Sequence, residues 1–260
     1  MFDRFSTSTV AAVGVAIGVA AGGIAAWSLV DGRDRPGSAA TVTDAATATE
    51  TAPASTGQPV GPDDYLAAWR RAHLAEVAVQ GHHALVADDR SGGDLELPSD
   101  AAIVRRARRG DALLDQLGTQ VTIGDADGLR SCLLTPTGSL ACGPPGPVAD
   151  VDGLEAGLRQ RFADADEAGD YEAFAVSPPT QLAGGLPVGV EAVSCWSLVA
   201  VRAVPLAAWG QVTTECFDDE TGALVWSTTR RAEEVSVFVA TSVRAPASDE
   251  DLQPAEVSGP

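Results

Sequence analysis

Four cysteines are the residues of this sequence whose type and spacing most directly suggest chemistry. Thiols can bind a metal, form a redox pair or close a disulfide, and their spacing helps to separate these roles. Two of them flank a Pro-Thr-Gly-Ser turn in the stretch RSCLLTPTGSLACG, residues 130–143. Cys132 and Cys142 are equidistant from Thr137, so an antiparallel hairpin centred there would bring them face to face. Opposed residues of such a hairpin lie within reach of a disulfide.

The second pair of cysteines repeats this symmetry. Cys195 and Cys216 are equidistant from a turn near Pro205 and Leu206. Four cysteines allow three connectivities, and hairpin symmetry favours Cys132–Cys142 and Cys195–Cys216. Zinc sites prefer spacings of roughly two to four residues within each pair, and a thioredoxin-like site needs Cys-x-x-Cys. Neither pattern is present, so two disulfides are the favoured prediction, with buried free thiols and a metal site as alternatives.

The other polar residues suggest neither catalysis nor metal binding. His82 and His83 are adjacent in a predicted strand, so they point to opposite faces and cannot chelate one ion together, and His73 lies in a predicted helix. The carboxylates are scattered through turns, and the chain has no G-x-S-x-G, P-loop or G-x-G-x-x-G motif. We therefore expect no catalytic residue, no metal site and no cofactor, and a protein that is not an enzyme.

One basic run interrupts a strongly acidic chain. The formal net charge is −19, and all 17 basic residues are arginines. Such a surface argues against binding to nucleic acid. The run RRARR contains Arg105, Arg106, Arg108 and Arg109. Guanidinium groups recognise phosphates and carboxylates, so these four side chains could contact an anionic head group. The alternative is a solvated strand or loop.

The elements that must position these residues are helices and antiparallel strands. The stretch GPDDYLAAWRRAHL predicts a helix that starts near Pro62 and EVAVQGHHALVAD predicts a strand, while AAIVRRARRGDALLDQLGTQVTIGDADGLRSCLL predicts two or three short strands. A second helical segment is expected over residues 151–174. Four strands are expected to follow at residues 191–203, 209–217, 222–230 and 234–244.

Two apolar patterns indicate a cavity. Leu154, Leu158 and Phe162 recur at every fourth residue of the second helical segment and share one face. Trp196 and Leu198 lie in CWSLVAVRAV, which is apolar on both faces, as expected for a strand that is covered on both sides or that lines a cavity on one. We expect these five side chains to line an apolar cavity between the sheet and the 151–174 segment; the alternative is an ordinary core.

The N-terminal part of the chain is expected to anchor the domain rather than to belong to it. Residues 9–30 are mostly apolar and match the ~20 residues that a helix needs to cross a bilayer. A cleaved signal peptide has a shorter apolar region, so a retained single-pass anchor is favoured, with cleavage as the alternative. Gly14, Gly18 and Gly22 form a smooth stripe along that helix, which could support self-association.

The segments around the anchor complete the expected organisation. Residues 31–62 are rich in Ala, Thr and Pro and predict a disordered linker. Disulfides persist only in oxidising compartments, so we expect residues 1–8 in the cytoplasm and a domain of residues 63–245 outside it. Residues 246–260 are expected to be an acidic flexible tail.

The order of these elements resembles a known family. Residues 216–254, CFDDETGALVWSTTRRAEEVSVFVATSVRAPASDEDLQP, contain a D-x-x-T-G hairpin, paired long strands and an acidic end. In this layout residues 63–254 resemble the LolA-like superfamily, which includes the actinobacterial LprG/LppX lipoproteins and the RseB sensor domain. The Lys-free composition also resembles that of proteins from high-GC actinobacterial genomes. The resemblance implies a half-open barrel that holds an acyl chain beneath helices. The chain departs from the lipoprotein members because it lacks a lipobox cysteine and has an apolar helix instead.

These observations lead to one expected architecture and two expected functions. The fold is predicted to be α+β, with a single strongly curved antiparallel sheet, a half-open barrel, that has helices on its concave side and follows one transmembrane helix. The expected function is that of a membrane-anchored, extracytoplasmic, non-enzymatic domain that binds a lipid or another apolar ligand. The alternative is an extracytoplasmic sensor or interaction module that recruits a protein partner.

Overall fold

The computed structural model describes residues 57–87, 97–135, 137–148, 150–162, 170–201, 210–231 and 234–255. The predicted anchor with Gly14, Gly18 and Gly22, and most of the predicted linker, lie outside these residues. Within the described ranges, no helix combines the length and the apolar character that a membrane crossing requires.

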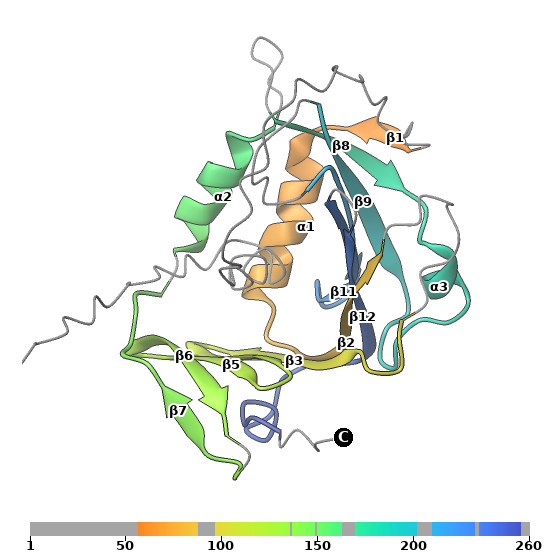
Figure 1. Ribbon diagram of the computed structural model, residues 1–260. Helices are drawn as coiled ribbons and strands as arrows, with labels where there is room; N and C mark the ends of the chain where they lie inside the picture. The colour runs from red at the N-terminus through yellow and green to blue at the C-terminus, as the bar shows by residue number, and fades with distance from the viewer. Residues whose placement is uncertain are drawn as a thin grey trace, which may run out of the picture.

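The described residues build one antiparallel sheet and three helices (Figure 1). The strand order is β1-β8-β9-β10-β11-β12-β2-β3-β4-β5-β6-β7. The helices are α1 (Pro62–Leu74), α2 (Val151–Arg159) and α3 (Thr180–Ala183). The strands are β1 (Gln58–Val60), β2 (Ala78–Ala87), β3 (Ala102–Arg109), β4 (Ala112–Leu117), β5 (Gln120–Asp125), β6 (Gly128–Leu134), β7 (Leu140–Cys142), β8 (Tyr171–Val176), β9 (Val193–Ala200), β10 (Val212–Asp218), β11 (Leu224–Arg231) and β12 (Glu234–Arg244).

The sheet bends sharply along its width. In Figure 1 strands β8 to β12 stand upright, β3 to β6 run across the lower part of the view, and α1 and α2 lie on the side toward which the sheet bends. The short helix α3 lies on the opposite face of β9. The predicted α+β class with an antiparallel sheet is therefore confirmed, and α1 and α2 pack on the concave side, whereas α3 does not.

A glycine and a bulge lie where β2 meets β12, next to the bend. The pairing register of these strands shifts between Ala240 and Ser242, and such bulges bend a strand and increase its twist. A Cβ atom on Gly81 would lie only 2.3 Å from the carbonyl oxygen of Val239. Glycine therefore permits a closer approach of the two backbones here than any other residue would.

Helix α2 is attached to α1 by charged side chains. Asp150 caps the N-terminus of α2 by accepting hydrogen bonds from the backbone N–H groups of Asp152 and Gly153. From α1, Arg70 forms ion pairs with Asp152 at 2.6 Å and with Glu155 at 2.7 Å. These pairs lie at the surface, one of them partly buried, so they orient α2 more than they stabilise it.

Several predicted boundaries are wrong. The linker was expected to continue to residue 62, but Gln58–Val60 form the edge strand β1, which pairs with β8. The helical segment was expected over 151–174, but α2 ends at Arg159 and residues 171–176 form β8, because the alternating sequence YEAFAV pairs with both β1 and β9. The segment that was expected to hold two or three strands holds β3, β4, β5 and β6.

The chain beyond β12 also differs from its prediction as a flexible tail. Ala247 and Asp251 are buried, at 2% and 4% exposure. Asp251 accepts hydrogen bonds from the backbone N–H and the hydroxyl of Ser248 and from Arg244. The side-chain amide of Gln116 on β4 bonds both the N–H and the carbonyl oxygen of Ala255, at 3.0 and 2.9 Å. Residues 246–255 are therefore part of the domain.

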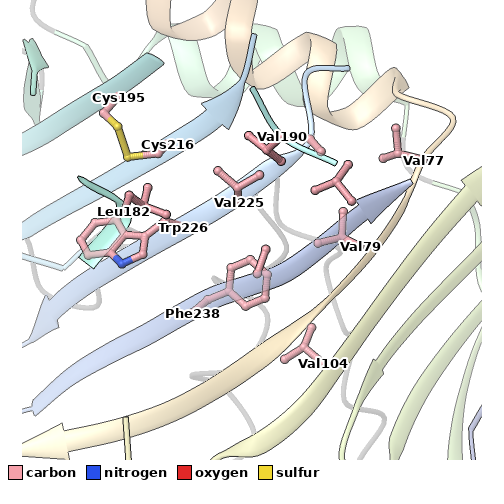
Figure 2. Packing of buried hydrophobic residues seen from close by; sticks show 13 residues of the cluster. Val77, Val79, Val104, Leu182, Val190, Cys195, Cys216, Val225, Trp226 and Phe238 are labelled. Atoms are coloured by element: carbon pink, nitrogen blue, oxygen red, sulfur yellow. A yellow bond between two sulfur atoms is a disulfide. The ribbon is translucent and has the colours of Figure 1, made fainter. Parts of the chain in front are cut away.

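Both predicted disulfides are present. Cys132 pairs with Cys142 across β6 and β7, and Cys195 pairs with Cys216 across β9 and β10, directly opposite each other in the register. Figure 2 shows the second disulfide beside Trp226 and Leu182, so α3 covers it. The mirror symmetry of each hairpin in the sequence thus identified the pairing correctly.

We expect each disulfide to stabilise the domain substantially. They close loops with sequence separations of 10 and 21 residues, for which the chain-entropy account gives roughly 3 kcal/mol each. Replacing Cys195 and Cys216 together by alanine should lower the free energy of unfolding in urea by about that amount. Mass mapping of an unreduced digest should recover both cross-linked peptides, and free thiols in exported protein would contradict the assignment.

Candidate functional site

A cavity of about 470 Å³ lies in the concave angle of the sheet, beneath the C-terminal half of α1. Apolar side chains from α1, α2 and both parts of the sheet make up most of its wall, including Trp69, Val79, Leu113, Leu129, Leu154 and Phe217. Sites for small molecules commonly have volumes of roughly 300–1,000 Å³ and mainly apolar walls with a few polar groups. The cavity fits this description.

The five side chains that were predicted to line the cavity occupy two different places. Leu154 lies at the cavity wall. Leu158 and Phe162 are buried instead in a packed cluster with Tyr65 of α1, and the same cluster contains Trp196 and Leu198. These four side chains therefore form an ordinary core, the alternative stated above. The reason is that α2 lies over α1, so only the first turns of α2 reach past α1 to the cavity.

The arginine run is also divided between two roles, because alternate residues of a strand face opposite sides. Arg106 and Arg108 of β3 line the cavity. Arg105 donates a hydrogen bond to the carbonyl oxygen of Gln253, and Arg109 is paired with Asp249, so these two bind the C-terminal segment. Only two of the four arginines, Arg106 and Arg108, therefore lie where a ligand in the cavity would meet them.

A polar group that the sequence analysis missed lies under α1 in the cavity wall. The Glu215 carboxyl of β10 is only 4% exposed, and its Oε2 accepts a hydrogen bond from the Tyr65 hydroxyl at 2.8 Å. Burial raises the pKa of Glu215 to about 7, although the Tyr65 hydrogen bond and the positive charge of Arg106 oppose that rise. Burial and the neighbouring carboxylate also raise the pKa of Tyr65.

Arg106 is the central cation of this part of the wall. Its Nε lies 3.4 Å from Oδ1 of Asp115 on the next strand, and its guanidinium lies over the ring of Phe238, 4.9 Å from the centroid. Enclosure in the cavity raises the pKa of Asp115, and the charge and hydrogen bond of Arg106 oppose this. Arg106 is thus held between a carboxylate and an aromatic face.

His73 adds no charge to the cavity near neutral pH. Its ring stacks on Trp69 with centroids 3.8 Å apart, and its Nδ1 lies 2.9 Å from the Trp69 carbonyl oxygen. Since a carbonyl only accepts hydrogen bonds, Nδ1 carries the proton. Burial, together with the positive charges of Arg108 and Arg106, lowers the pKa of His73 to about 4, although the hydrogen bond to Trp69 opposes this. The imidazole is therefore neutral at pH 7.

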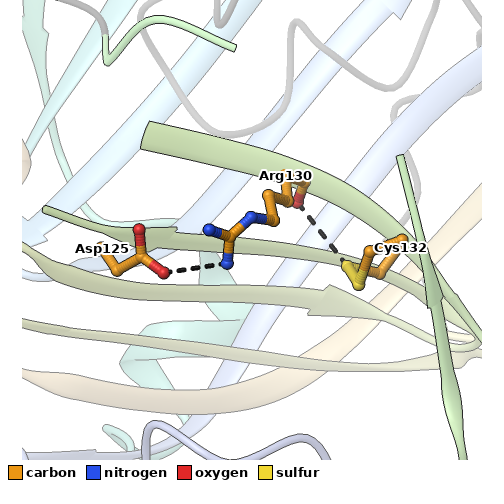
Figure 3. The surroundings of a disulfide bond; sticks show 4 residues. Asp125, Arg130 and Cys132 are labelled. Carbon is orange, nitrogen blue, oxygen red and sulfur yellow. Dashed lines mark hydrogen bonds and ion pairs between the residues drawn. A yellow bond between two sulfur atoms is a disulfide. The ribbon is translucent and has the colours of Figure 1, made fainter. Parts of the chain in front are cut away.

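The turn between β5 and β6 forms part of the cavity wall. Asp125 lies at the cavity, and its Oδ2 is 3.0 Å from Nη1 of Arg130 (Figure 3). In the same view the Cys132 sulfur lies 3.9 Å from the Arg130 carbonyl oxygen. This is a van der Waals contact, because a disulfide sulfur has no proton to donate. The positive charge of Arg130 compensates the negative charge of Asp125 at this side of the cavity.

The described histidines make contacts within the fold. In the part of the chain that the structure describes, no group of three His, Cys, Asp or Glu side chains is placed to hold a metal ion. His83 is buried with its Nε2 2.9 Å from the Ser236 hydroxyl, and burial, with the charge of Arg106, lowers its pKa to about 4. The cavity offers hydrogen bonds, charge and apolar surface for binding.

The sequence contains a weak signal for Glu215. On β10, Thr213, Glu215 and Phe217 alternate toward the face that α1 covers, so a carboxylate stands at a position where the pattern favours apolar residues. A charge on a buried face is expensive without a partner and suggests a specific role. Tyr65, its partner, is 150 residues away in the sequence, so local patterns could not identify it.

Solved structures with a similar arrangement of elements have low sequence identity to this chain. A LolA superfamily protein from Nitrosomonas europaea is 9% identical, with a TM-score of 0.28, over 75% of this chain and 98% of that one. LprF from Mycobacterium bovis is 11% identical, with a TM-score of 0.34, over 78% and 100%. MucB, solved in complex with MucA(peri), is 13% identical, with a TM-score of 0.38, over 75% and 60%.

These three proteins belong to the LolA-like groups that the sequence resembles in the order of its elements. Neither a protein-family model nor a curated protein matches the chain.

Proposed function

We propose that this domain binds a lipid or another ligand with a long apolar part in the cavity between α1, α2 and the bent sheet. The observation that carries the proposal is the cavity itself: about 470 Å³, walled mainly by apolar side chains, with a few charged groups at defined places. Filling such a cavity with an apolar chain would remove apolar surface from water, which is favourable.

We further propose that the domain works outside the cytoplasm, attached to the membrane by residues 9–30. The two disulfides support an oxidising compartment, and the apolar N-terminal stretch has the length of a membrane-crossing helix. We also propose that the site binds its ligand without catalysing a reaction.

A tryptophan placed in the cavity should displace the ligand. Ala72 of α1 is half-buried and lines the cavity, whereas Ala67 of the same helix is exposed. Full-length wild type, Ala72→Trp and Ala67→Trp would be purified in parallel, extracted with organic solvent and analysed by mass spectrometry. We expect Ala72→Trp to retain at least about tenfold less of one lipid class than the other two proteins, which corresponds to a loss of about 1.4 kcal/mol in binding.

The Ala67→Trp control corrects for lipid that adheres to the apolar N-terminal segment. Equal lipid in all three proteins would contradict binding in the cavity. The absence of co-purified lipid from all three, together with a protein captured by cross-linking, would favour the interaction module instead.

A further inference from the structure

The cavity wall contains more acidic than basic side chains. The wall includes four carboxyl side chains and two guanidinium groups, which are Asp111, Asp115, Asp125, Glu215, Arg106 and Arg108. Asp115 is paired with Arg106, and Asp125 with Arg130 outside the wall. Arg108 donates to the carbonyl oxygen of His73. After these pairings, two carboxyls face one guanidinium, so the wall has an excess of negative charge.

Of these four carboxyl groups, Glu215 is the most deeply buried. It is more than nine-tenths buried, yet it lies on the cavity wall. Tyr65 donates to its Oε2 at 2.8 Å. Buried polar atoms nearly always have a hydrogen-bond partner. A carboxyl that is this deeply buried and lies at the wall of a mainly apolar cavity is therefore a place for a ligand's hydrogen-bond donor.

We propose that the cavity selects an amphiphile with a positively charged, hydrogen-bond-donating head, such as an alkylammonium group, which donates to Glu215. This inference rests on the proposed binding of an apolar chain in the same cavity. The head would compensate the carboxylate charge, while the chain would lie against Val79, Leu113 and Leu154. Two of the four arginines that were expected to contact an anionic head, Arg105 and Arg109, bind the C-terminal segment instead.

Electrostatics and protonation both support a cationic head. An anionic head near Arg106 would also lie close to Asp115 and Glu215, in the field of a chain with a net charge of −19. Burial raises the pKa of Glu215 to about 7, so this position resists an uncompensated negative charge. An ammonium group removes that resistance by supplying a charge-assisted hydrogen bond.

The test uses three photo-reactive probes that share one hexadecyl chain and differ in the head: ammonium, hydroxyl or sulfate. The full-length chain would be reconstituted in phosphatidylcholine vesicles, irradiated with each probe, and the labelled peptides of the cavity wall quantified by mass spectrometry. Each probe is compared between wild type and Glu215→Gln. The partition of the probe into the bilayer then cancels in the ratio.

We expect Glu215→Gln to reduce ammonium-probe labelling about 10- to 100-fold, the range for a hydrogen bond to a charged group. Labelling by the hydroxyl probe should change less than about twofold. Asp111→Asn is the matched control, because it removes an exposed carboxylate from the same cavity. It should change ammonium labelling by less than about threefold, since exposed charges are screened.

The outcomes separate this inference from the proposed function. If no probe labels the cavity of wild type more than that of Ala72→Trp, the proposed function fails and the inference fails with it. If the probes label the cavity but Glu215→Gln reduces all three equally, or the sulfate probe labels best, the domain binds apolar chains and the cationic preference is wrong.

Discussion

The Glu215→Gln variant is expected to be more stable than wild type at pH 8 and about equally stable at pH 4. The Glu215 carboxyl has a pKa of about 7 in the folded protein, against an ordinary value of 4.5, because it is buried. The folded state therefore holds its proton more tightly than the unfolded state. The stability that this proton provides is complete below the unfolded pKa and is lost as the pH rises through the folded pKa.

The magnitude follows from the size of the shift. Each unit of pKa difference corresponds to about 1.4 kcal/mol, so the wild type loses about 3 kcal/mol relative to the glutamine variant between about pH 4.5 and 7. Urea unfolding of both proteins at intervals from pH 4 to 8, with the disulfides intact, measures this difference. His73 and His83 also titrate in the acid range but are present in both proteins, so their contribution largely cancels.

A second carboxyl serves as the control for this titration. Asp111 lies at the same cavity but is exposed, so Asp111→Asn removes a solvated carboxylate and should change the free energy of unfolding at pH 8 by less than about 0.5 kcal/mol. A constant difference between wild type and Glu215→Gln would mean that Glu215 is not buried as the structure places it.

The Trp69→Ala variant is expected to lose about 3–5 kcal/mol of unfolding free energy, the cost typical of deleting a buried aromatic side chain. Trp69 is 1% exposed and packs between the core under α1 and the wall of the cavity. Its removal would leave a void that joins the cavity, because the Trp69 side chain itself lines the cavity. Chemical unfolding at a single pH is sufficient to measure the change.

Leu74 provides the comparison on the same helix. It lies in the last turn of α1 and is 47% exposed, so Leu74→Ala should cost less than about 1 kcal/mol. Equal losses for the two variants would indicate that α1 is not packed on the sheet through Trp69. Because Trp69 also lines the cavity, its variant should bind less apolar ligand than Leu74→Ala does.

The arginines on the two faces of β3 have different roles. Arg106 and Arg108 charge the cavity, while Arg105 and Arg109 reach the opposite side and hold residues 246–255. A substitution at Arg109 should therefore affect the C-terminal segment rather than the ligand. The acidic segment that follows β12 is explained by the same observation, since it supplies Asp249 to Arg109 and Asp251 to Arg244.

Features that depend on short stretches of chain could be predicted from the sequence alone. The symmetric spacing of Cys132 and Cys142, and of Cys195 and Cys216, identified both disulfides because a hairpin places residues at equal distances from its turn opposite each other. Alternating residues likewise located β9 to β12 to within a few residues. The α+β class followed from the order of these elements, since each one is determined largely by its own periodicity.

Only the tertiary structure decided which of these residues meet at the cavity. The stripe of α2 is continuous in the sequence, yet α1 covers Leu158 and leaves Leu154 at the wall. Tyr65 and Glu215 are separated by 150 residues and are joined by a hydrogen bond because α1 packs across β10. Such contacts depend on the bend of the sheet and on where the helices settle on it, and these result from packing among distant segments rather than from any local pattern.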